Sequence, residues 1–508
     1  MIMKSTGFIK YIFFIPLFWT SCTKEPTPNP GDTHADAPAN RWIYEKMKEE
    51  YLYNYKVKAI ANPNYNRPCE VFFQSLLSSS SMDNDGKHPD RYGNYTFYSY
   101  MERTGPGVYS RLTKSGSTLS YGFQFVVMQF GTNYLARVLY VHGGSAAASA
   151  GLKRGDWIKK IGSEYITLDN YGKLTSGGPV TITVCRNENA ARSGATLDLS
   201  DEEQISLGLA TIIDDKPVFL SKVFDAGAHK IGYMVYNSFD PGSGSAYDNA
   251  MKTAFFNFKQ QGATDIIIDL RYNGGGYVSC AQLMASMMLP VAMLPLSSSD
   301  NVNIFGTGEF NADLAAKGRK ETFRFENRSA IENYNLDLQS GARIIVLTGR
   351  WTASASELII NALNPYVESY AADGGVRIIG RPTEGKNVGS YEISNSSYGI
   401  TLHPIVLTFS NRDGESDYSQ GFVPASGDEK NELDISTDNV QFHMRELGDE
   451  EEYLLRYAIA AITGVPVSGS LAPSPLESRS TGEGRVVASS LDMRSIQGAI
   501  TDIGQEYE

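Results

Sequence analysis

Two short runs of apolar residues constrain the fold of this chain more than any other feature. They span Asp265–Leu270 and Ala342–Leu347, and neither shows the strict alternation of apolar and polar residues that a half-exposed strand requires. Such runs are typical of parallel strands that are buried on both faces of a sheet. A helix-like pattern precedes the first run at 245–261, and another follows the second run at 355–362. Strands that alternate with helices predict an α/β core with a mostly parallel sheet.

The chain is longer than one hydrophobic core usually organises. Its 508 residues predict two or three folded units, and its 42% apolar and 20% charged residues are ordinary for a globular protein. The net charge of −12 argues against a nucleic-acid partner, because nothing would neutralise a phosphate backbone. We divide the chain into a signal peptide (1–21), a lipidated linker (22–40), a small helical N-terminal unit (41–117), a β-domain (118–205), an α/β core (206–470) and a loosely ordered tail (471–508).

The first residues carry the features of a signal peptide. Lys4 and Lys10 precede an apolar run, Tyr11–Trp19, that is too short to span a bilayer. Small residues then lead into Cys22, a pattern that resembles a bacterial lipobox, in which the cysteine is acylated and becomes the mature N-terminus. The Pro-rich stretch that follows is typical of a tether. The resemblance implies a lipid-anchored protein of the cell envelope, on its periplasmic or outer-membrane face; a plain secretory signal that contains a cysteine is the alternative.

The N-terminal unit begins with an amphipathic pattern. Ile43, Met47 and Tyr51 recur four residues apart with charged residues between them, which predicts a helix over 41–53 that docks on later structure. The stretch 78–90 is typical of a loop. The sequence does not indicate what this unit does.

A β-rich pattern with glycine turns occupies 118–205. Strand-like runs surround a Gly-rich segment, 143–162, in which Ser145 predicts the cap of a short helix of small residues. This region resembles a PDZ domain of the bacterial protease type. In that family an extended peptide adds as a strand beside the first strand, and the preceding loop binds the C-terminal carboxylate through backbone N–H groups. An unrelated small β-domain is the alternative. The resemblance places peptide binding at Tyr121, Gly122, Phe123, Gln124 and Phe125.

Both apolar strands of the core run into loops that could carry chemistry, because catalytic groups on α/β sheets gather at the carboxyl ends of strands. The first loop holds three consecutive glycines, 274–276, whose unobstructed N–H groups suit an oxyanion hole, although a tight turn explains them equally well. The second holds Ser354 and Glu357 at the start of an apolar helix. That spacing is also the capping-box pattern. A serine at a helix N-terminus nevertheless lies where free amides stabilise developing negative charge.

A serine nucleophile needs a base, which is usually a histidine. No histidine lies in a Gly-rich or acidic cluster, and neither a Gly-x-Ser-x-Gly nor a His-Glu-x-x-His pattern occurs. This argues against a histidine-based triad and against a metal site, so we expect neither a metal nor an organic cofactor. A lysine serves instead if burial lowers its pKa from about 10.4 towards 7–8. The histidines are His34, His88, His142, His229, His403 and His443; Cys69, Cys185 and Cys280 are too widely spaced for zinc and are expected to be buried and reduced.

Three segments resemble, in order and spacing, the signature of C-terminal processing peptidases, the S41 or tail-specific protease family. They are Asp269–Gly276, Thr352–Glu357 and Gly380–Ser390. The resemblance covers about 205–465 and implies a ClpP/crotonase-like α/β protease core. Together with the PDZ-like unit it extends over roughly three quarters of the chain.

Residue by residue, the resemblance implies a Ser/Lys dyad. Ser354 is then the nucleophile, and Lys386 takes its proton and later returns it. Glu357 orients or polarises the lysine. The backbone N–H groups of Gly275, Gly276 and Ala355 form the oxyanion hole, without the sequence deciding which glycine contributes.

The chain departs from the family pattern in two places. Many relatives have Asn-Pro-Gly-Gly where this chain has Asn273 and three glycines. The family has a glycine directly after the lysine, whereas here Asn387 and Val388 intervene, which puts the local backbone in doubt. The segment 421–424, Gly-Phe-Val-Pro, resembles the family's Gly-x-x-Pro, although a simple turn explains it as well.

The resemblance implies a serine endopeptidase that cleaves extended or unfolded proteins through an acyl-enzyme. Substrates would be captured by apolar C-termini in the PDZ-like unit. One alternative is an envelope lipoprotein that binds a peptide or ligand on the same fold without cutting it. Another is an envelope scaffold in which the PDZ-like unit recruits partners and hydrolysis is incidental.

Overall fold

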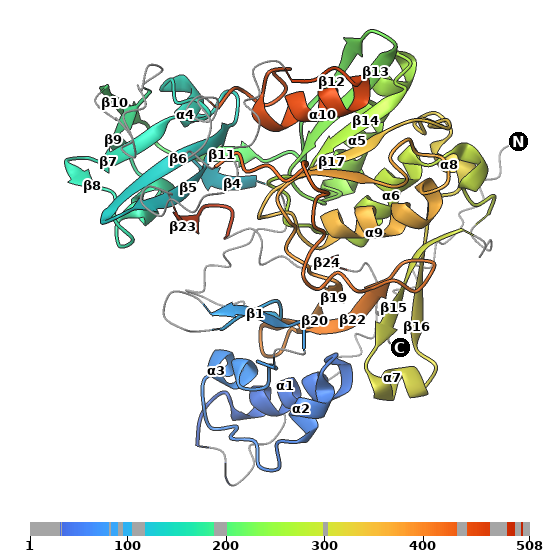
Figure 1. The fold of residues 1–508 in the computed structure, drawn as a ribbon. Coiled ribbons are helices and arrows are strands. Elements are labelled where there is room, and N and C mark those ends of the chain that lie inside the picture. The colour runs from blue at the N-terminus through green and yellow to red at the C-terminus, as the bar shows by residue number, and fades with distance from the viewer. Residues whose placement is uncertain are drawn as a thin grey trace, which may run out of the picture.

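The structure is a computed structural model, and it describes residues 31, 33–80, 83–89, 95–103, 117–186, 201–297, 303–433, 444–467, 485–492 and 499–500 (Figure 1). The predicted signal peptide and Cys22 lie outside the described residues. No helix within those ranges combines the length and apolarity that a bilayer crossing needs.

The centre of the molecule is a five-stranded sheet in the order β12-β13-β14-β17-β18. The strands from β13 to β18 run parallel, and β12 is an antiparallel edge. The two apolar runs form the inner strands β14 and β17, in which every residue is buried, so the predicted α/β core is confirmed. The strand bounds are Val218–Ala226 (β12), His229–Tyr236 (β13), Asp265–Asp269 (β14), Ile344–Thr348 (β17) and Arg377–Gly380 (β18).

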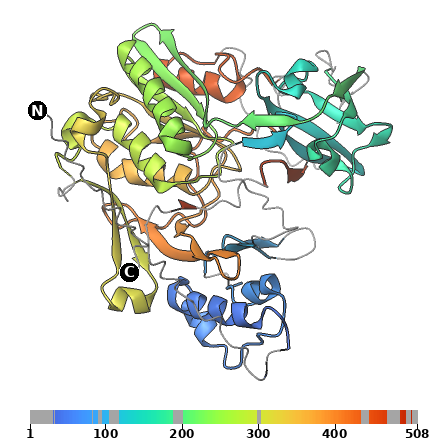
Figure 2. The same ribbon diagram turned by 180° about the vertical axis from the view of Figure 1, so that it is seen from behind.

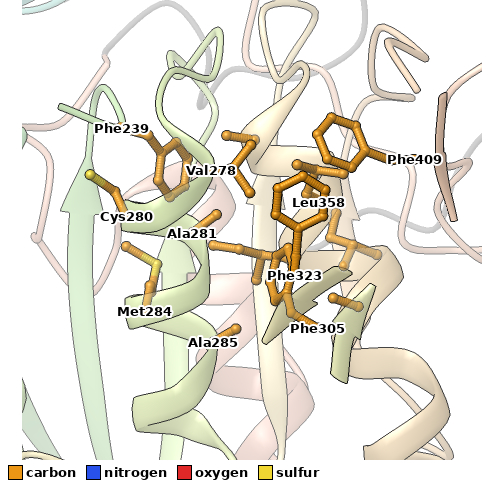
Figure 3. Close-up of a cluster of buried hydrophobic side chains, with 14 of the residues drawn as sticks. Phe239, Val278, Cys280, Ala281, Met284, Ala285, Phe305, Phe323, Leu358 and Phe409 are labelled. Carbon is orange, nitrogen blue, oxygen red and sulfur yellow. The ribbon is translucent and has the colours of Figure 1, made fainter. Parts of the chain in front are cut away.

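Helices cover both faces of this sheet. Three of them, α5 (Ala246–Gln260), α6 (Val278–Met288) and α9 (Ala355–Val367), pack on the face to which Ile266 and Ile268 point. The opposite face, with Ile267, packs against α10 (Tyr453–Thr463). Alternate side chains of these strands therefore pack into two hydrophobic cores, one on each face of the sheet, and this is why the apolar runs are continuous. Figure 3 shows part of the first cluster, to which Ala281 and Met284 of α6 and Leu358 of α9 belong.

Other strands of the chain form a second sheet, separate from the central one. Its order is β16-β15-β22-β19-β24, and the short strand β19 begins just after Lys386. The strand bounds are Ile304–Phe310 (β15), Lys320–Arg324 (β16), Val388–Ser390 (β19), Ile405–Ser410 (β22) and Ala499–Ile500 (β24). Short helices α7 (Ala312–Ala316) and α8 (Arg328–Ile331) lie between its strands in sequence.

The N-terminal unit is helical, as predicted, and lies at the opposite end of the molecule from α10 (Figures 1 and 2). Its first helix starts at Ala37 rather than at 41, since Pro38 occupies the first turn, where a missing N–H is tolerated. The unit joins the core through a three-stranded sheet in the order β20-β21-β3. The bounds are Ala37–Glu50 (α1), Asn54–Lys58 (α2), Cys69–Gln74 (α3), Gly86–Pro89 (β1), Tyr95–Phe97 (β2), Tyr100–Arg103 (β3), Ile393–Asn395 (β20) and Ile400–His403 (β21).

The β-domain forms a sheet in the order β10-β9-β7-β6-β5-β23, with β8 paired to β7. The predicted short helix α4 (Ala146–Ser149) is present, and Ser145 Oγ caps it by accepting a bond from the Ala148 amide. The strand bounds are Ser117–Ser120 (β4), Phe123–Phe130 (β5), Asn133–Val141 (β6), Trp157–Ile161 (β7), Glu164–Tyr165 (β8), Val180–Cys185 (β9), Glu202–Leu207 (β10), Thr211–Asp214 (β11) and Arg485–Ser489 (β23).

The strand β23 corrects one expectation. It comes from the region 471–508, which the sequence analysis treated as a loosely ordered tail. Composition averaged over that region hides the run of Val486, Val487 and Ala488, whose β-branched and small side chains suit a strand once β5 offers an edge. Within the described part of the tail, β23 is therefore ordered by pairing with a strand more than 350 residues upstream.

A buried cluster of charges connects the β-domain to the end of β14. The Arg271 guanidinium donates to Asp269, Glu432 and Glu452 over distances of 2.7–3.1 Å. Arg154, which precedes β7, donates to Glu432 at 2.8 Å and to Glu452 at 3.1 Å. All five side chains are buried. Opposite charges within this cluster offset the desolvation of each member, and the pKa of Glu432 falls to about 2 because the two arginines outweigh its burial.

Removing one acid from this cluster should destabilise the protein strongly. Glu452→Ala leaves two buried guanidiniums with fewer carboxylates and also removes the cap that accepts from the Leu454 and Leu455 amides at the start of α10. Breaking a buried pair typically costs about 3–5 kcal/mol. Urea unfolding followed by tryptophan fluorescence measures the loss. The control Glu164→Ala removes an exposed partner of Lys173 and should leave unfolding unchanged; equal effects of both variants would contradict a structural role of the cluster.

Candidate active site

Three loops meet at the carboxyl edge of the central sheet. They follow β14, β17 and β18, which are adjacent and parallel, so their carboxyl ends meet at one place. Thr352, in the β17 loop, donates through its hydroxyl to the Leu270 carbonyl at 2.8 Å. Its own carbonyl accepts from the Glu384 amide of the β18 loop at 2.9 Å. Thr352 therefore fixes the three loops relative to one another.

Ser354 lies at the N-terminus of α9 in an unusual backbone conformation. Its φ is 60° and its ψ is −117°, values that residues with a Cβ rarely adopt. The side chain is buried, and its Oγ has no hydrogen-bond partner in the part of the chain that the structure describes. Such strain persists only where surrounding contacts enforce it, and it concentrates at functional sites. Ser354 and Glu357 do form the capping box that the sequence pattern predicts at the start of α9, with the Ser354 amide donating to Glu357 at 2.8 Å. The cap therefore positions Ser354, while its hydroxyl makes no close hydrogen bond among the described residues.

Glu357 connects the serine to the lysine. One of its carboxylate oxygens, Oε2, accepts from the amides of Ser354 and Lys386, each at 2.8 Å. The other, Oε1, accepts from Thr383 Oγ1 and from the Gly385 amide, each at 2.6 Å. Burial raises the pKa of this carboxyl to about 6, although the four hydrogen bonds oppose the shift. Glu357, the predicted acid, therefore hydrogen-bonds to the backbone of both Ser354 and Lys386 rather than to the lysine ammonium group.

Lys386 is buried with its amino group unpaired. The side chain is 1% exposed, and Nζ has no hydrogen-bond partner among the described residues. It lies 4.4 Å from the centre of the Tyr98 ring. Burial lowers the pKa of the amine to about 8, and the charges of Asp85, Glu357 and Glu384 limit that fall. A lysine in this environment exchanges a proton near neutral pH.

The N-terminal unit supplies residues that sequence reasoning missed. Asp85 is fully buried and accepts from Tyr51 and Ser99, and its charge acts on Lys386. Tyr98 places its ring against the lysine and donates its hydroxyl to Glu384 at 3.1 Å. No local signal could have identified these residues, because they lie in or near a predicted loop about 300 positions upstream of the lysine.

The side chain of Asn84 adds a further contact between the N-terminal unit and the loop that carries Lys386. Its amide donates to the Gly385 carbonyl at 3.0 Å and to the Asn387 side chain at 2.7 Å. Asn387 itself donates to the Ser416 carbonyl at 2.8 Å, and the chain then enters β19 at Val388. The two residues that intervene after the lysine therefore carry contacts to the N-terminal unit and lead into a strand.

Of the two predicted oxyanion glycines, Gly275 lies against the serine, whereas Gly276 lies against the backbone of Phe239. A Cβ added to Gly275, whose φ is +105°, would lie 2.7 Å from Ser354 Cβ and 3.0 Å from the Ala355 nitrogen. The Gly275 amide already donates to Asn273 Oδ1 at 2.8 Å. The amides of Gly276 and Ala355 make no such bond within the described ranges. Gly275 therefore permits the close approach, and Gly276 and Ala355 keep N–H groups for an incoming oxygen.

The segment 421–424 belongs to this site. The Phe422 amide donates to Thr383 Oγ1 at 2.8 Å, and the Phe422 carbonyl accepts from the Thr383 amide at 3.1 Å. A Cβ on Gly421, whose φ is +80°, would lie 2.0 Å from the Thr383 carbonyl oxygen. The segment thus holds Thr383, which in turn donates to Glu357. It is more than a simple turn.

The other predicted groups lie apart from these loops. Tyr121, Gly122, Phe123, Gln124 and Phe125 are at and just before the start of β5, in the β-domain. Cys69, Cys185 and Cys280 are buried and form no disulfide, as expected. Within the described ranges, no group of three or more histidine, cysteine or acidic side chains has a geometry that could hold a metal ion.

Two family models match this chain. A model of peptidase family S41 matches residues 230–424, which contain the three loops, Ser354 and Lys386. A model of the peptidase S41 N-terminal domain matches residues 39–100, which contain Asp85 and Tyr98. The two matched ranges together span just over half of the chain.

One solved structure with a similar fold agrees with these matches, and a second, more weakly similar one is given for comparison. A Bacteroides fragilis NCTC 9343 protein assigned to the S41 proteases is similar with 26% identity and a TM-score of 0.64, over 84% of this chain and 98% of that chain. A photosystem II D1 C-terminal processing protease is similar with 16% identity and a TM-score of 0.43, over 78% of this chain and 93% of that one. Since both its catalytic region and its N-terminal region match models of one family, the chain belongs to peptidase family S41.

Proposed function

We propose that this protein is a serine endopeptidase with Ser354 as nucleophile and Lys386 as general base. One observation carries the proposal: a single buried carboxylate, Glu357, accepts from the backbone amides of both residues. The serine hydroxyl and the lysine amine are both buried and unpaired among the described residues. Two buried reactive groups whose backbones are fixed by the same carboxylate, and whose own polar atoms make no hydrogen bond among the described residues, are best explained by chemistry on a substrate.

The reaction is acyl transfer. The neutral amine of Lys386 accepts the proton of Ser354 Oγ as this oxygen attacks the carbonyl carbon of the substrate's peptide bond. The carbonyl oxygen becomes an oxyanion, which the amides of Gly276 and Ala355 stabilise at the N-terminus of α9. Lys386 then returns the proton to the leaving amine as the C–N bond breaks. Water, deprotonated by the same lysine, hydrolyses the ester and restores the serine.

The surroundings of the lysine set its proton affinity. Burial alone favours the neutral base, whereas Asp85, Glu357 and Glu384 favour the ammonium ion that forms during the reaction. The face of the Tyr98 ring also attracts a cation. This balance supports a base that is about one-tenth neutral at pH 7 and still returns a proton readily.

The substrates are extended or unfolded proteins that enter by their C-termini. This part of the proposal is supported by the PDZ-like pattern of 118–205 and by the family, one of whose similar structures is a C-terminal processing protease. The buried contacts of Arg154 give the β-domain a direct physical link to Arg271, two residues before Asn273. The domain proposed to bind the peptide is therefore connected, through this charge cluster, to the loop after β14 that holds Gly275 and Gly276.

Variants of the two reactive residues test the proposal. Ser354→Ala and Lys386→Arg should each lower kcat/KM on an unfolded reporter protein by about 10³-fold or more, because arginine keeps the charge but is not deprotonated in proteins. Ser397→Ala and Lys216→Ala change exposed residues and should leave the rate unaltered. Cleavage is followed by the fluorescence of a quenched reporter. Full cleavage by either site variant would contradict the dyad, and binding without turnover by the unaltered protein would favour the non-catalytic alternative.

The pH dependence of kcat/KM should follow the protonation of Lys386. Because only neutral Lys386 accepts the proton, kcat/KM should rise with pH and level off above about 8. Asp85→Asn removes a negative charge that raises the pKa of Lys386, so the rising limb should move to lower pH. The exposed Asp225→Asn should leave the profile in place. An unchanged midpoint in Asp85→Asn would show that this carboxyl does not act on the base.

We further infer that acylation of Cys22 anchors the protein in the cell envelope. The support is the sequence pattern of residues 1–38 alone. Cys22→Ser should move the exported protein from the membrane fraction to the soluble fraction on cell fractionation. Cys69→Ser, which alters a buried cysteine, is the control and should remain with the membranes. Equal membrane retention of both variants would contradict the anchor.

A further inference from the structure

The outer edge of β5 is occupied by the chain's own C-terminal region. One side of β5 pairs with β6, and the other side pairs with β23 in antiparallel register, with Arg485 opposite Gln129 and Ser489 opposite Val126. Figure 1 shows β23, in dark red, beside the strands of the β-domain. This edge borders the residues predicted to bind a peptide by strand addition.

The contacts at the end of β23 use those same residues. The Ser490 amide donates to the Phe125 carbonyl at 3.0 Å, and the Phe125 amide donates to Ser490 Oγ at 2.9 Å. Ser490 Oγ also lies 2.6 Å from Gln124 Oε1, and Ser489 Oγ donates to the Phe125 carbonyl at 3.0 Å. Main-chain bonds of this kind supply the affinity of strand addition. The segment therefore occupies the edge as a bound peptide would.

Side chains of the same segment pack into two different cores. Val487 and Ala488 pack against the core of the β-domain, whereas Val486 and Leu491, which is 2% exposed, pack against the core that covers the other face of the central sheet. An irregularity in the strand pairing between Val486 and Ala488 accompanies this change of side. The segment thus has an apolar residue that anchors it beyond the strand itself.

The segment also contacts the loop that carries the nucleophile. Trp351 Nε1 donates to Asp492 Oδ1 at 2.9 Å, and Trp351 lies three residues before Ser354. Further along the chain, β24 pairs in parallel with β19, which begins two residues after Lys386. The C-terminal region therefore runs from the β5 edge to elements next to both proposed dyad residues.

We propose that the β5 edge is a strand-addition site whose resident occupant is the chain's own segment 485–492, and that a substrate peptide binds there by displacing this segment. This inference deepens the proposed function and rests on it for the identity of the incoming peptide. The contacts define the peptide: an extended segment with a hydroxyl residue at the position of Ser490, an apolar residue next and a carboxylate after it.

The resident segment competes through its attachment to the chain. A tethered ligand acts at an effective concentration that reaches the millimolar range for short flexible connections. A free peptide of similar intrinsic affinity, about 10 μM, would then bind roughly 100-fold more weakly than it would to a vacant edge. Substrates that engage the site must therefore supply additional contacts or high local concentration.

Peptide binding in an inactive background tests this. A fluorescein-labelled peptide of sequence Arg-Val-Val-Ala-Ser-Ser-Leu-Asp, copied from 485–492, is titrated with Ser354→Ala protein and followed by anisotropy. A Ser354→Ala chain that ends at residue 484 should bind at least tenfold more tightly than the full-length Ser354→Ala chain. A scrambled peptide should bind neither. Equal affinity for both chains, or no binding to the shortened one, would overturn the proposal.

A point variant serves if the shortened chain does not fold, which thermal unfolding reveals. Ser490→Pro removes both the amide and the hydroxyl that bond Phe125, and it should raise peptide affinity in the same direction. Arg485→Ala, at the exposed far end of β23, is the matched control and should bind as the full-length protein does. Unchanged affinity in Ser490→Pro would overturn the proposal.

The readouts separate this inference from the proposed function. Binding is measured in Ser354→Ala protein and needs no turnover, whereas cleavage is measured with Ser354 present. Tighter binding by the shortened chain in a protein that never cleaves would leave the β5 site standing and remove the peptidase proposal. Cleavage without any change in peptide affinity would do the reverse.

Discussion

The guanidinium of Arg271 is the point on which three parts of the molecule depend. It follows β14, it is buried, and it donates to carboxylates from the strand itself, from the segment near 432 and from the cap of α10. Two of those carboxylates also hold Arg154 of the β-domain. Because no member of the cluster can be left unpaired without a large loss of stability, the β-domain, α10 and the loop that follows β14 occupy one mutual arrangement.

The proposed dyad depends on a second shared carboxylate. Glu357 satisfies backbone amides on two loops, so Ser354 and Lys386 are positioned without using their own reactive atoms. The side chains that surround the lysine then come from another unit of the chain. The pKa of Lys386 is set mainly by burial, which lowers it, and by the charges of Asp85 from the N-terminal unit and of Glu357 and Glu384 from the core, which oppose that fall. The Tyr98 ring, from the N-terminal unit, lies 4.4 Å from the amine.

Sequence patterns predicted the parts of this structure that depend on local order. The runs at 265–270 and 342–347 predicted the inner strands, because a strand that is buried on both faces has mostly apolar residues at consecutive positions. Ser354, Glu357 and Lys386 were found by their resemblance to a family signature, and the structure brings them together. Asp85, Tyr98 and β23 were not found, since their roles arise from pairings across about 300 or more residues. Such pairings leave no periodicity that a single sequence reveals.

The burial of Lys386 beneath Tyr98 has a consequence for when the enzyme becomes active. The N-terminal unit is synthesised first, and the loop that carries the lysine emerges about 290 residues later. Until the two parts meet, the amine is solvated and keeps the ordinary proton affinity of a lysine, so it is a poor base at neutral pH. In the proposed mechanism, a chain that is still unfolded therefore carries no competent base. The same mechanism makes folding the activation step, so that the protein could not attack other proteins before the N-terminal unit and the lysine loop have met.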